Sequence, residues 1–265
     1  LGNYASSKLI PTLKKNKNIE FIGLANATGI SSKNKANKFN FSYYSANYNE
    51  IITDKDINTI FISTRHSNHF ELSKLSLELN KNVFVEKPPC IDEIELEKLI
   101  SLYNENNCFS NLKYMVGLNR RFSPHIEKIK NNIVKNSSKI QMLYRVNGGP
   151  IDLSSWTHEV QHGEGMLVGE MCHFIDTIIY LIDSRPIQLF AYHVDFSEEN
   201  TYKKSDNIIV NIKFDNGSIA SLFYNTIGNK NLNKELIEVY SEGRIGIVDD
   251  FVVTRTINSS KNLVN

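Results

Sequence analysis

The sequence predicts an α/β domain over residues 1–120, followed by an α+β domain with an open, mainly antiparallel sheet over residues 121–265. In the first part, short apolar runs alternate with helical patterns, which is typical of βαβ units with a parallel sheet covered on both faces. In the second part, strand patterns follow one another through tight turns, which favours antiparallel pairing. Of the 265 residues, 41% are hydrophobic, enough to bury a sizeable core.

In the first domain, four apolar runs have the length and composition of buried strands. They lie at residues 19–25, 59–63, 82–85 and 114–118. Apolar residues at helical spacing predict helices over residues 6–15, 70–79 and 92–106, and residues 31–38 are expected to form a short polar helix. Asp92 stands where its side chain can cap the last of these helices.

The second domain contains one strongly apolar helix, over residues 167–182. The remaining apolar patterns predict strands at residues 139–147, 187–195, 207–214, 218–226, 235–241 and 244–248. Asp215-Asn216-Gly217 and Glu242-Gly243 have the composition of hairpin turns. Because hairpins join neighbouring strands, these turns predict a sheet that is antiparallel over most of its width.

The balance of charges excludes several classes of function. With 30 basic and 29 acidic residues, the net charge is +1, which gives no electrostatic basis for binding nucleic acid or an anionic membrane. No apolar run approaches the roughly 20 residues of a membrane span, and no signal peptide is recognisable. Cys90, Cys108 and Cys172 lack metal-type spacing. They are expected to be free thiols in a reducing compartment, which favours the cytoplasm.

The first residues match the second half of a dinucleotide-binding turn. Gly2-Asn3-Tyr4 leads directly into a predicted helix, as in folds where a glycine lets the backbone approach a pyrophosphate at the helix N-terminus. The strand that normally precedes this turn is absent, so we expect a chain truncated at its start. The alternatives are a helix-terminal glycine without a ligand, or a protein that begins here and binds nucleotides poorly.

After the next predicted strand, an acidic residue usually holds the ribose 2′-hydroxyl. Asn26 stands there instead, followed by Thr28, Ser32 and Lys33, which could hold a 2′-phosphate. The cofactor is therefore expected to be NAD or NADP, with a slight preference for NADP. A polar loop without this role is the alternative.

Several motifs occur in an order that belongs to one family. Val85-Glu86-Lys87-Pro88-Pro89 follows a predicted buried strand, and Asn119-Arg120-Arg121-Phe122-Ser123-Pro124 leads into the second domain. Others are Thr64 to His69, Gly163-Glu164-Gly165, and Cys172-His173-Phe174-Ile175-Asp176. Each is common by chance, but together they make the chain similar to the Gfo/Idh/MocA oxidoreductases. The resemblance runs from residue 2 to about residue 250. It implies a Rossmann-like first domain and reversible oxidation of a hydroxyl on a sugar, nucleotide-sugar or cyclitol.

A narrower resemblance concerns one branch of that family. Gly2-Asn3-Tyr4-Ala5, Tyr144-Arg145-Val146-Asn147 and Gly169 to Asp176 are similar to the branch often fused behind a zinc-dependent alcohol dehydrogenase-like domain. That branch is linked to cell-surface sugar metabolism. This narrower resemblance implies an upstream fusion partner and truncation at the start. The family resemblance implies truncation at the end as well, and a homodimer or homotetramer paired through the open sheet face.

The family resemblance also implies roles for individual residues. Lys87 would lie beside the nicotinamide and the reacting hydroxyl, where its ammonium stabilises a developing alkoxide. His173 would be the base, since imidazole titrates near neutral pH. Asp176, three residues on, would orient His173 or the substrate. The structural alternatives are a core histidine and a solvated lysine. The residues expected to contact the cofactor are Gly2, Asn3, Tyr4, Asn26, Thr28, Thr64, His69, Glu86, Lys87 and Arg120. The residues expected to contact the substrate are Asn147, Trp156, His158 and Glu170.

One position departs from the family pattern. Many members carry Asp four residues before the histidine, and this chain has Gly169 there, with Glu170 next to it. Glu170 could replace the missing acid if the start of the helix is shifted. If it cannot, Lys87 and His173 act alone or the chemistry differs.

Two other classes of function compete with this interpretation. His158-Glu159-Val160-Gln161-His162 fits the His-Glu-x-x-His pattern of zinc peptidases, which needs both histidines on one helix face. Gly163 and Gly165 follow at once, so a long helix is not expected, and no metal is expected. The other competitor is a non-catalytic cofactor-binding or regulatory relative, since fold does not dictate function.

Overall fold

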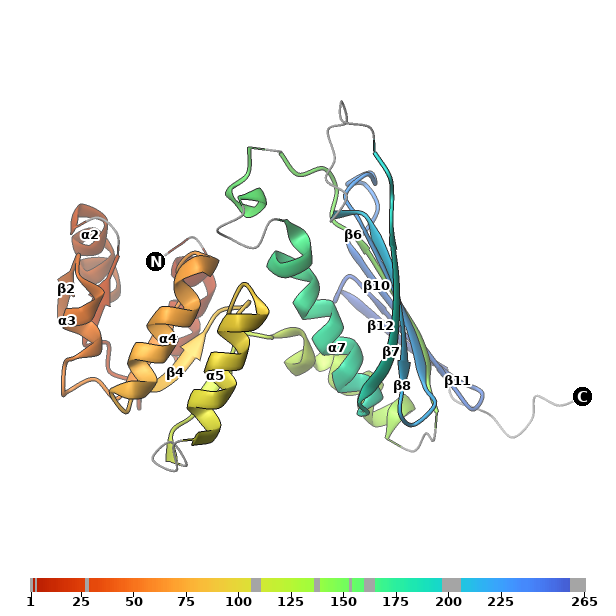
Figure 1. Cartoon of the computed structure of the whole chain (residues 1–265), viewed down its shortest axis with the longest axis horizontal. Coiled ribbons are helices and arrows are strands. Elements are labelled where there is room, and N and C mark those ends of the chain that lie inside the picture. Colours follow the sequence, from red (N-terminus) through yellow and green to blue (C-terminus); the bar gives the residue numbers. More distant parts are fainter. Residues whose placement is uncertain are drawn as a thin grey trace, which may run out of the picture. The chain divides into compact units, whose positions relative to one another are not determined.

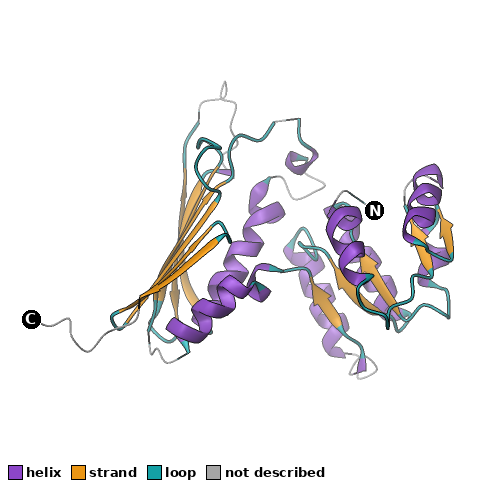
Figure 2. Cartoon of the chain, turned by 180° about the vertical axis from the view of Figure 1, so that it is seen from behind, coloured by secondary structure: helices purple, strands orange, loops and turns teal. Residues whose placement is uncertain are grey.

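The computed structural model describes residues 2, 4–26, 29–105, 111–135, 139–152, 154–159, 165–196 and 206–257. The chain divides into two compact units, Leu1–Gly117 and Leu118–Asn265. Both combine helices and strands, and Figures 1 and 2 show the elements of each. No helix in the described ranges is long and apolar enough to cross a membrane.

The first unit is built on parallel strands. β1 (Gly23–Ala25) pairs with β2 (Tyr43–Ser45), and a second group contains β3 (Thr59–Ile62), β4 (Asn82–Val85) and β5 (Tyr114–Val116) in that order. The strand expected from residue 19 is assigned only from Gly23 on, and β2 was not anticipated. Parallel pairing agrees with the α/β class predicted for this half.

Helices connect these strands, and all except α3 were expected from the sequence. They are a π-helical turn over Ala5–Leu9 that continues into α1 (Ile10–Leu13), then α2 (Gly29–Phe39), α3 (Tyr48–Ile52), α4 (His69–Glu78) and α5 (Glu93–Glu105). Asp92 caps α5, because its Oδ1 accepts from the Glu95 N–H at 2.8 Å. Ile60, Ile62, Val83 and Val85 are buried, whereas Phe61 is 39% exposed. The sheet is therefore less evenly covered on its two faces than the sequence suggested.

In the second unit, seven strands of the described chain form one sheet. Its order is β12 (Val253–Ile257), β11 (Arg244–Asp249), β10 (Glu235–Ser241), β6 (Gln141–Asn147), β9 (Ile219–Asn225), β8 (Ile208–Phe214) and β7 (Pro186–His193). All neighbours are antiparallel except β6 and β9, which run parallel. The mainly antiparallel sheet is thus confirmed.

The expected hairpin turns are present. Asp215 to Gly217 joins β8 to β9, and Glu242-Gly243 joins β10 to β11. Gly217, Glu242 and Gly243 all have positive φ, the conformation that such turns require.

Helices cover one face of this sheet. They are α6 (Pro124–Ile129), which continues as a π-helical turn over Lys130–Val134, and α7 (Cys172–Ile182), preceded by a π-helical turn over Leu167–Met171. Figure 1 shows α7 running along the sheet. Phe174, Ile178 and Leu181 of α7 are fully buried with Tyr144 of β6 and Tyr224 of β9. The opposite face is open: Tyr192, Ile209, Phe223 and Leu143 are between 38% and 72% exposed.

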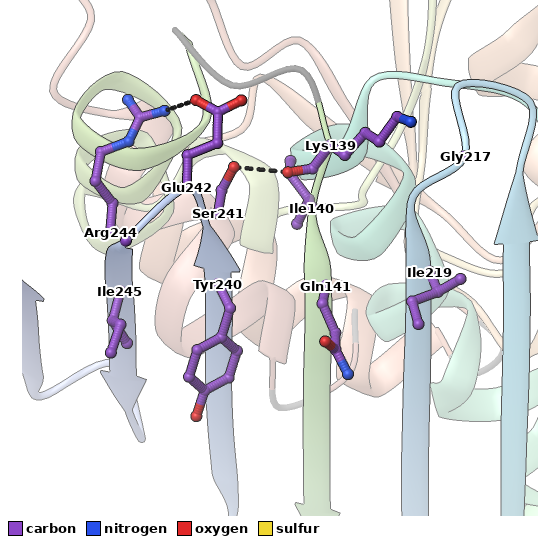
Figure 3. A pocket seen from close by; sticks show the side chains of 11 residues that line it. Lys139, Ile140, Gln141, Gly217, Ile219, Tyr240, Ser241, Glu242, Arg244 and Ile245 are labelled. Carbon is purple, nitrogen blue, oxygen red and sulfur yellow. Dashed lines mark hydrogen bonds and ion pairs between the residues drawn. The ribbon is translucent and has the colours of Figure 1, made fainter. Parts of the chain in front are cut away.

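A shallow hollow lies at one end of the open sheet (Figure 3). Its lining includes Lys139, Gly217, Tyr240 and the ion pair between Arg244 and Glu242, 3.1 Å apart. It lies at the beginning of β6, whereas Asn147 ends that strand. None of the residues predicted to bind cofactor or substrate lines it.

Candidate active site

The first group of predicted residues follows three paired strands of the first unit. Ile62, Val85 and Val116 are aligned in register at the carboxyl ends of β3, β4 and β5. Thr64, Glu86, Lys87 and Gly117 come directly after these strands. In open α/β sheets, ligands bind at the carboxyl edge. The fold therefore brings the predicted residues Thr64, Glu86 and Lys87 to this edge, together with Gly117, which was not predicted to be a site residue.

His69 joins two of the loops at this edge. Its Nδ1 lies 2.6 Å from the Pro88 carbonyl oxygen, and its Nε2 lies 3.2 Å from the Thr64 carbonyl oxygen. The residue is 1% exposed, and burial lowers the pKa of His69 although both carbonyls oppose that shift. His69 thus joins the loop after β3 to Pro88, the residue that follows Lys87, and a direct contact with the cofactor stays a prediction.

Glu86 lies against the next strand end. A Cβ built on Gly117 would stand 3.0 Å from Oε2 of Glu86, so only glycine allows this close approach without displacing the carboxylate. Burial raises the pKa of Glu86, although Lys87 opposes the rise. The Lys87–Pro88 peptide bond that follows is cis.

The N-terminal turn and the loop after β1 complete this unit. The Gly2 carbonyl accepts from the Ser6 N–H at 3.1 Å, and a Cβ on Gly2 would meet no described heavy atom within 4 Å. Tyr4 is 48% exposed. Asn26 donates through Nδ2 to the Ser31 hydroxyl at 2.9 Å. Asn3 and Thr28 lie outside the described residues.

Ser32 does not face a ligand in this conformation. It is fully buried, and its hydroxyl donates to the Asn26 carbonyl at 3.4 Å. One of the three residues on which the preference for NADP rested is therefore unavailable to a 2′-phosphate.

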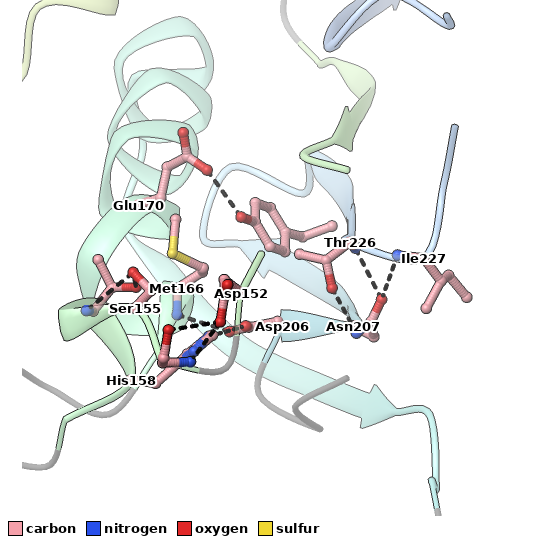
Figure 4. A network of polar contacts seen from close by, with 12 residues as sticks. Asp152, Ser155, His158, Met166, Glu170, Asp206, Asn207, Thr226 and Ile227 are labelled. Atoms are coloured by element: carbon pink, nitrogen blue, oxygen red, sulfur yellow. Dashed lines mark hydrogen bonds and ion pairs between the residues drawn. The ribbon is translucent and has the colours of Figure 1, made fainter. Parts of the chain in front are cut away.

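In the second unit, Glu170 belongs to a polar cluster on the helical face of the sheet. Its Oε2 accepts from the Tyr224 hydroxyl at 2.9 Å, and its Oε1 accepts from the Lys234 ammonium (Figure 4 shows the contact at Oε2). The Glu170 side chain is 14% exposed and that of Lys234 is 40% exposed. Burial acts to raise the pKa of Glu170, but Lys234, Tyr224 and Arg120 outweigh it, so the net direction is down.

The π-helical turn over Leu167–Met171 bears on the departure at Gly169. A π turn inserts one extra residue into a helical turn and so rotates the preceding residues relative to a regular helix. Gly169 is buried, and Glu170 contacts Tyr224 of β9 and Lys234, the residue before β10. The start of this helix therefore departs from regular α-helical geometry, and the replacement of the missing acid by Glu170 stays a prediction.

Arg120 is held within the second unit. Its Nε and Nη2 donate to the two carboxylate oxygens of Glu235 at 2.8 and 2.6 Å, and its guanidinium stacks 4.7 Å from the Phe174 ring centre. The Tyr144 hydroxyl donates to Glu235 as well, at 2.5 Å. Burial lowers the pKa of Arg120, but Glu235 outweighs it and the net direction is up. Contact of Arg120 with the cofactor stays a prediction.

On α7, His173 is 7% and Asp176 is 9% exposed. Both carboxylate oxygens of Asp176 accept from Arg121, one of them from Nε at 2.8 Å. Arg121 also stacks 5.1 Å from the Tyr180 ring centre. The structure thus pairs Asp176 with Arg121, and the orienting role predicted for Asp176 stays a prediction.

The other predicted substrate residues all precede α7 in the sequence. Asn147 donates through Nδ2 to the carbonyls of Asn229 and Leu232, at 2.8 and 3.2 Å, and so fixes the connection between β9 and β10. Trp156 and His158 share one short 3₁₀ turn, and His158 Nε2 lies 2.8 Å from Oδ2 of Asp206.

The rival zinc motif lacks the helix that it needs. His158 ends the 3₁₀ turn, and Glu159 has extended backbone angles, φ −71° and ψ 134°. His162 lies outside the described residues. Among the described residues, no three His, Cys, Asp or Glu side chains form a group that could hold a metal ion. Because two histidines four apart share a face only on a helix, this geometry does not support a peptidase site.

Several residues of the site were not predicted from the sequence. They are Arg121, Tyr144, Asp206, Tyr224, Lys234 and Glu235. Their partners are far along the chain: Arg120 and Glu235 are 115 residues apart. The doublet Lys234-Glu235 at the start of a predicted strand was the available signal, because a charged residue on an inward-facing strand position needs a partner.

Replacing Glu170 with Gln is expected to weaken the acid sensitivity of the fold. A carboxyl whose pKa is lower in the folded state stabilises the protein above the ordinary value of 4.5, and this stabilisation is lost as pH falls through the folded-state pKa. Urea unfolding over a pH series should therefore show a smaller loss of stability below pH 4.5 in Glu170→Gln than in wild type. The exposed Glu97→Gln is the matched control. An equal loss of stability in acid for Glu170→Gln and wild type would contradict a lowered pKa of Glu170 in the folded protein.

Comparisons with known proteins match both units. Residues 1–117 match the model described as GFO_IDH_MocA, an oxidoreductase family with an NAD-binding Rossmann fold. Residues 138–247 match the GFO/IDH/MocA C-terminal domain.

Individual relatives are more distant. The chain is 23% identical over 193 residues to the uncharacterized oxidoreductase YrbE of Bacillus subtilis, which covers 71% of this chain and 54% of that protein. It is 27% identical over 101 residues to inositol 2-dehydrogenase of Salmonella typhimurium, covering 38% and 29%. This chain thus spans about half the length of YrbE.

Solved structures share the fold. Levoglucosan dehydrogenase in complex with NADH superposes with a TM-score of 0.79 at 19% identity, covering 92% of this chain and 68% of that one. A probable dehydrogenase from Thermotoga maritima gives a TM-score of 0.74 at 16% identity, covering 94% and 73%. At these identities the likeness concerns the fold alone.

Proposed function

Because the chain belongs to the Gfo/Idh/MocA family of oxidoreductases, we propose that it transfers a hydride between a nicotinamide cofactor and a hydroxyl-bearing carbon of a sugar, nucleotide-sugar or cyclitol. The observation that carries the proposal is the gathering of Thr64, Glu86, Lys87 and Gly117 at the carboxyl edge of β3, β4 and β5. Relatives named as inositol 2-dehydrogenase and D-xylose 1-dehydrogenase support the substrate class.

The residues of the first unit fit a dinucleotide. Space is open above Gly2 at the start of the first helix, and backbone N–H groups at a helix start favour an anion. Gly117 lets Glu86 pack closely beside Lys87. When bound, the nicotinamide ring supplies the hydride acceptor or donor. The N-terminal turn, Asn26, Thr64 and Glu86 would hold the cofactor.

Lys87 and His173 have separate roles in the proposed reaction: Lys87 stabilises charge and His173 transfers the proton. As the C–H bond breaks, the hydroxyl oxygen becomes alkoxide-like, and the Lys87 ammonium stabilises that charge. His173 takes the hydroxyl proton through a ring nitrogen and returns it in the reverse direction. One hydride and one proton leave the alcohol carbon and oxygen, so the product is a carbonyl.

Glu170 and Lys234 are proposed to bind substrate hydroxyls. Each oxygen of Glu170 accepts one hydrogen bond from the protein, and a carboxylate has capacity for more. Around this pair, Arg120 is matched by Glu235 and Arg121 by Asp176. This balance favours a neutral sugar or cyclitol ring over a sugar acid, because a carboxylate substrate would compete with three existing ion pairs.

The cofactor and the assembly belong to the same proposal. NAD and NADP are both compatible with Asn26, and levoglucosan dehydrogenase, which shares the fold, was solved in complex with NADH.

The open sheet face, with Tyr192 72% and Phe190 57% exposed, would pair subunits into a homodimer or homotetramer. Among the described residues, Cys90 and Cys172 are not joined in disulfides, which suits a cytoplasmic enzyme.

Titration of NADH and NADPH against the protein tests the proposal. Saturable binding of one or both is expected. Gly2→Ala should weaken it about tenfold without changing thermal stability, because the added methyl fills space that only a ligand would occupy. Ser7→Ala, on an exposed position of the same helix, is the matched control.

Turnover separates the enzyme from a non-catalytic relative. The protein is incubated with NAD⁺ or NADP⁺ and with myo-inositol, D-xylose or levoglucosan, and reduced nicotinamide is followed by absorbance. Cofactor binding without turnover on any neutral polyol would favour the regulatory alternative, which the departure at Gly169 supports. The absence of binding to either cofactor would overturn the proposal.

A further inference from the structure

Asp206 stands just before β8 and makes two buried contacts. It is 1% exposed; its Oδ1 accepts from the Met166 N–H at 2.8 Å, and its Oδ2 lies 2.8 Å from Nε2 of His158 (Figure 4). The side chain of His158 is 4% exposed. One carboxylate thus contacts two segments that precede α7.

The first contact lies at the start of a helix. Met166 directly precedes the π-helical turn over Leu167–Met171, and its own side chain provides no cap. Backbone N–H groups at a helix start lack intrahelical acceptors, and a negative charge there is stabilising. Asp206 supplies both the acceptor and the charge from 40 residues away. It therefore fixes the start of the helix that carries Glu170 and His173.

The second contact holds the short turn of Trp156 and His158. Because Nε2 of His158 lies within hydrogen-bond distance of Asp206, only Nδ1 could reach a substrate, and Nδ1 is buried. Separating this pair would leave a buried carboxylate short of a partner, which is costly. His158, predicted to contact substrate, is better explained as a member of this pair.

Hydrogen bonds tie the residue next to Asp206 to the neighbouring strand. Asn207, the next residue, accepts through Oδ1 from the N–H groups of Thr226 and Ile227 at 2.9 and 3.3 Å, and donates through Nδ2 to the Thr226 hydroxyl at 3.0 Å. Figure 4 shows these bonds beside the Asp206 contacts. The start of β8 is thus tied to the end of β9. Because Asp206 adjoins this point and accepts from the Met166 N–H, it holds the helix start at a fixed place relative to the sheet.

We propose that Asp206 is a positioning residue, which sets the start of the helix bearing Glu170 and His173 and holds the Trp156–His158 turn against it. The inference rests on the proposed function, because it assigns Glu170 and His173 to the substrate. Small displacements of reacting groups are costly: about 1 Å can lower a rate about 100-fold.

The test uses Asp206→Ala and Asp206→Asn. Asp206→Ala should lower kcat about 100-fold and change KM and the NADH dissociation constant by less than about threefold. Asp206→Asn keeps an oxygen that can accept from Met166, so it should recover about tenfold of that loss. Hydrogen exchange of the amides at 166–171 should quicken in Asp206→Ala. Asp215→Asn, in the exposed turn after β8, is the matched control and should resemble wild type.

A second variant keeps the test decisive if Asp206→Ala does not fold. His158→Gln retains an N–H donor near the Nε2 position, so it should keep slow exchange at 166–171 and most of kcat. An unchanged kcat in folded Asp206→Ala, or equal loss in Asp206→Asn and Asp206→Ala, would overturn the positioning role. If wild type shows no turnover at all, the proposed function fails, whereas slow exchange at 166–171 that depends on Asp206 still supports the anchor.

Discussion

Lys87→Met is expected to lower kcat about 1000-fold while the protein remains folded and still binds the nicotinamide cofactor. The expectation follows from its place directly after β4, at the carboxyl edge shared with Thr64 and Gly117. An ammonium directed at a developing alkoxide acts mainly in the transition state, and removal of one such group costs about 10²–10³ in kcat. Loss of a ground-state contact alone would raise KM instead.

The measurement is steady-state kinetics together with NADH titration. Lys98→Met, on an exposed position of α5, controls for loss of a surface charge. Lys87→Arg keeps the charge but changes the donor geometry and cannot release its proton, so it should recover only part of the activity. A variant Lys87→Met with wild-type kcat and a raised KM would show that Lys87 serves binding only.

Much of the fold follows from local patterns in the sequence. The apolar periodicity of residues 167–182, the capping Asp92 and the turn Glu242-Gly243 each act over a few residues, and the structure has all three. Elements that depend on tertiary packing were harder to predict from the sequence. β2 is only Tyr43–Ser45, too short to carry a pattern, and the parallel pairing of β6 with β9 is fixed by strands distant in sequence.

The candidate site shows the same division. The motif around Lys87 was visible because its residues are contiguous. The charge network around Glu170 could not be predicted from the sequence. Its members Tyr224, Lys234 and Arg120 come from separate parts of the chain and meet only after the sheet forms. Sequence periodicity also assumes a regular helix, whereas the π-helical turn over Leu167–Met171 changes which residues share a face.

His173→Asn is expected to lower kcat about 10²–10⁴-fold, the usual contribution of a positioned general base. His173 is buried on α7 next to Phe174, whose ring packs 5.2 Å from Tyr144 and 5.9 Å from Tyr224, so the helix cannot shift to bring another base. Without an imidazole, the hydroxyl proton must leave to water. The kcat of His173→Asn should therefore continue to rise with pH at values where the kcat of wild type no longer changes.

Asp176→Asn separates a catalytic effect from a structural one. Arg121 donates to both carboxylate oxygens of Asp176, so this variant removes the negative partner of a half-buried guanidinium. It should lower the free energy of unfolding by about 1–3 kcal/mol and lower kcat far less than His173→Asn does. His173→Asn should show the reverse order, with a large loss of kcat and a small loss of stability. If both variants lose kcat in proportion to stability, His173 is a core residue of α7 and the base must be sought elsewhere.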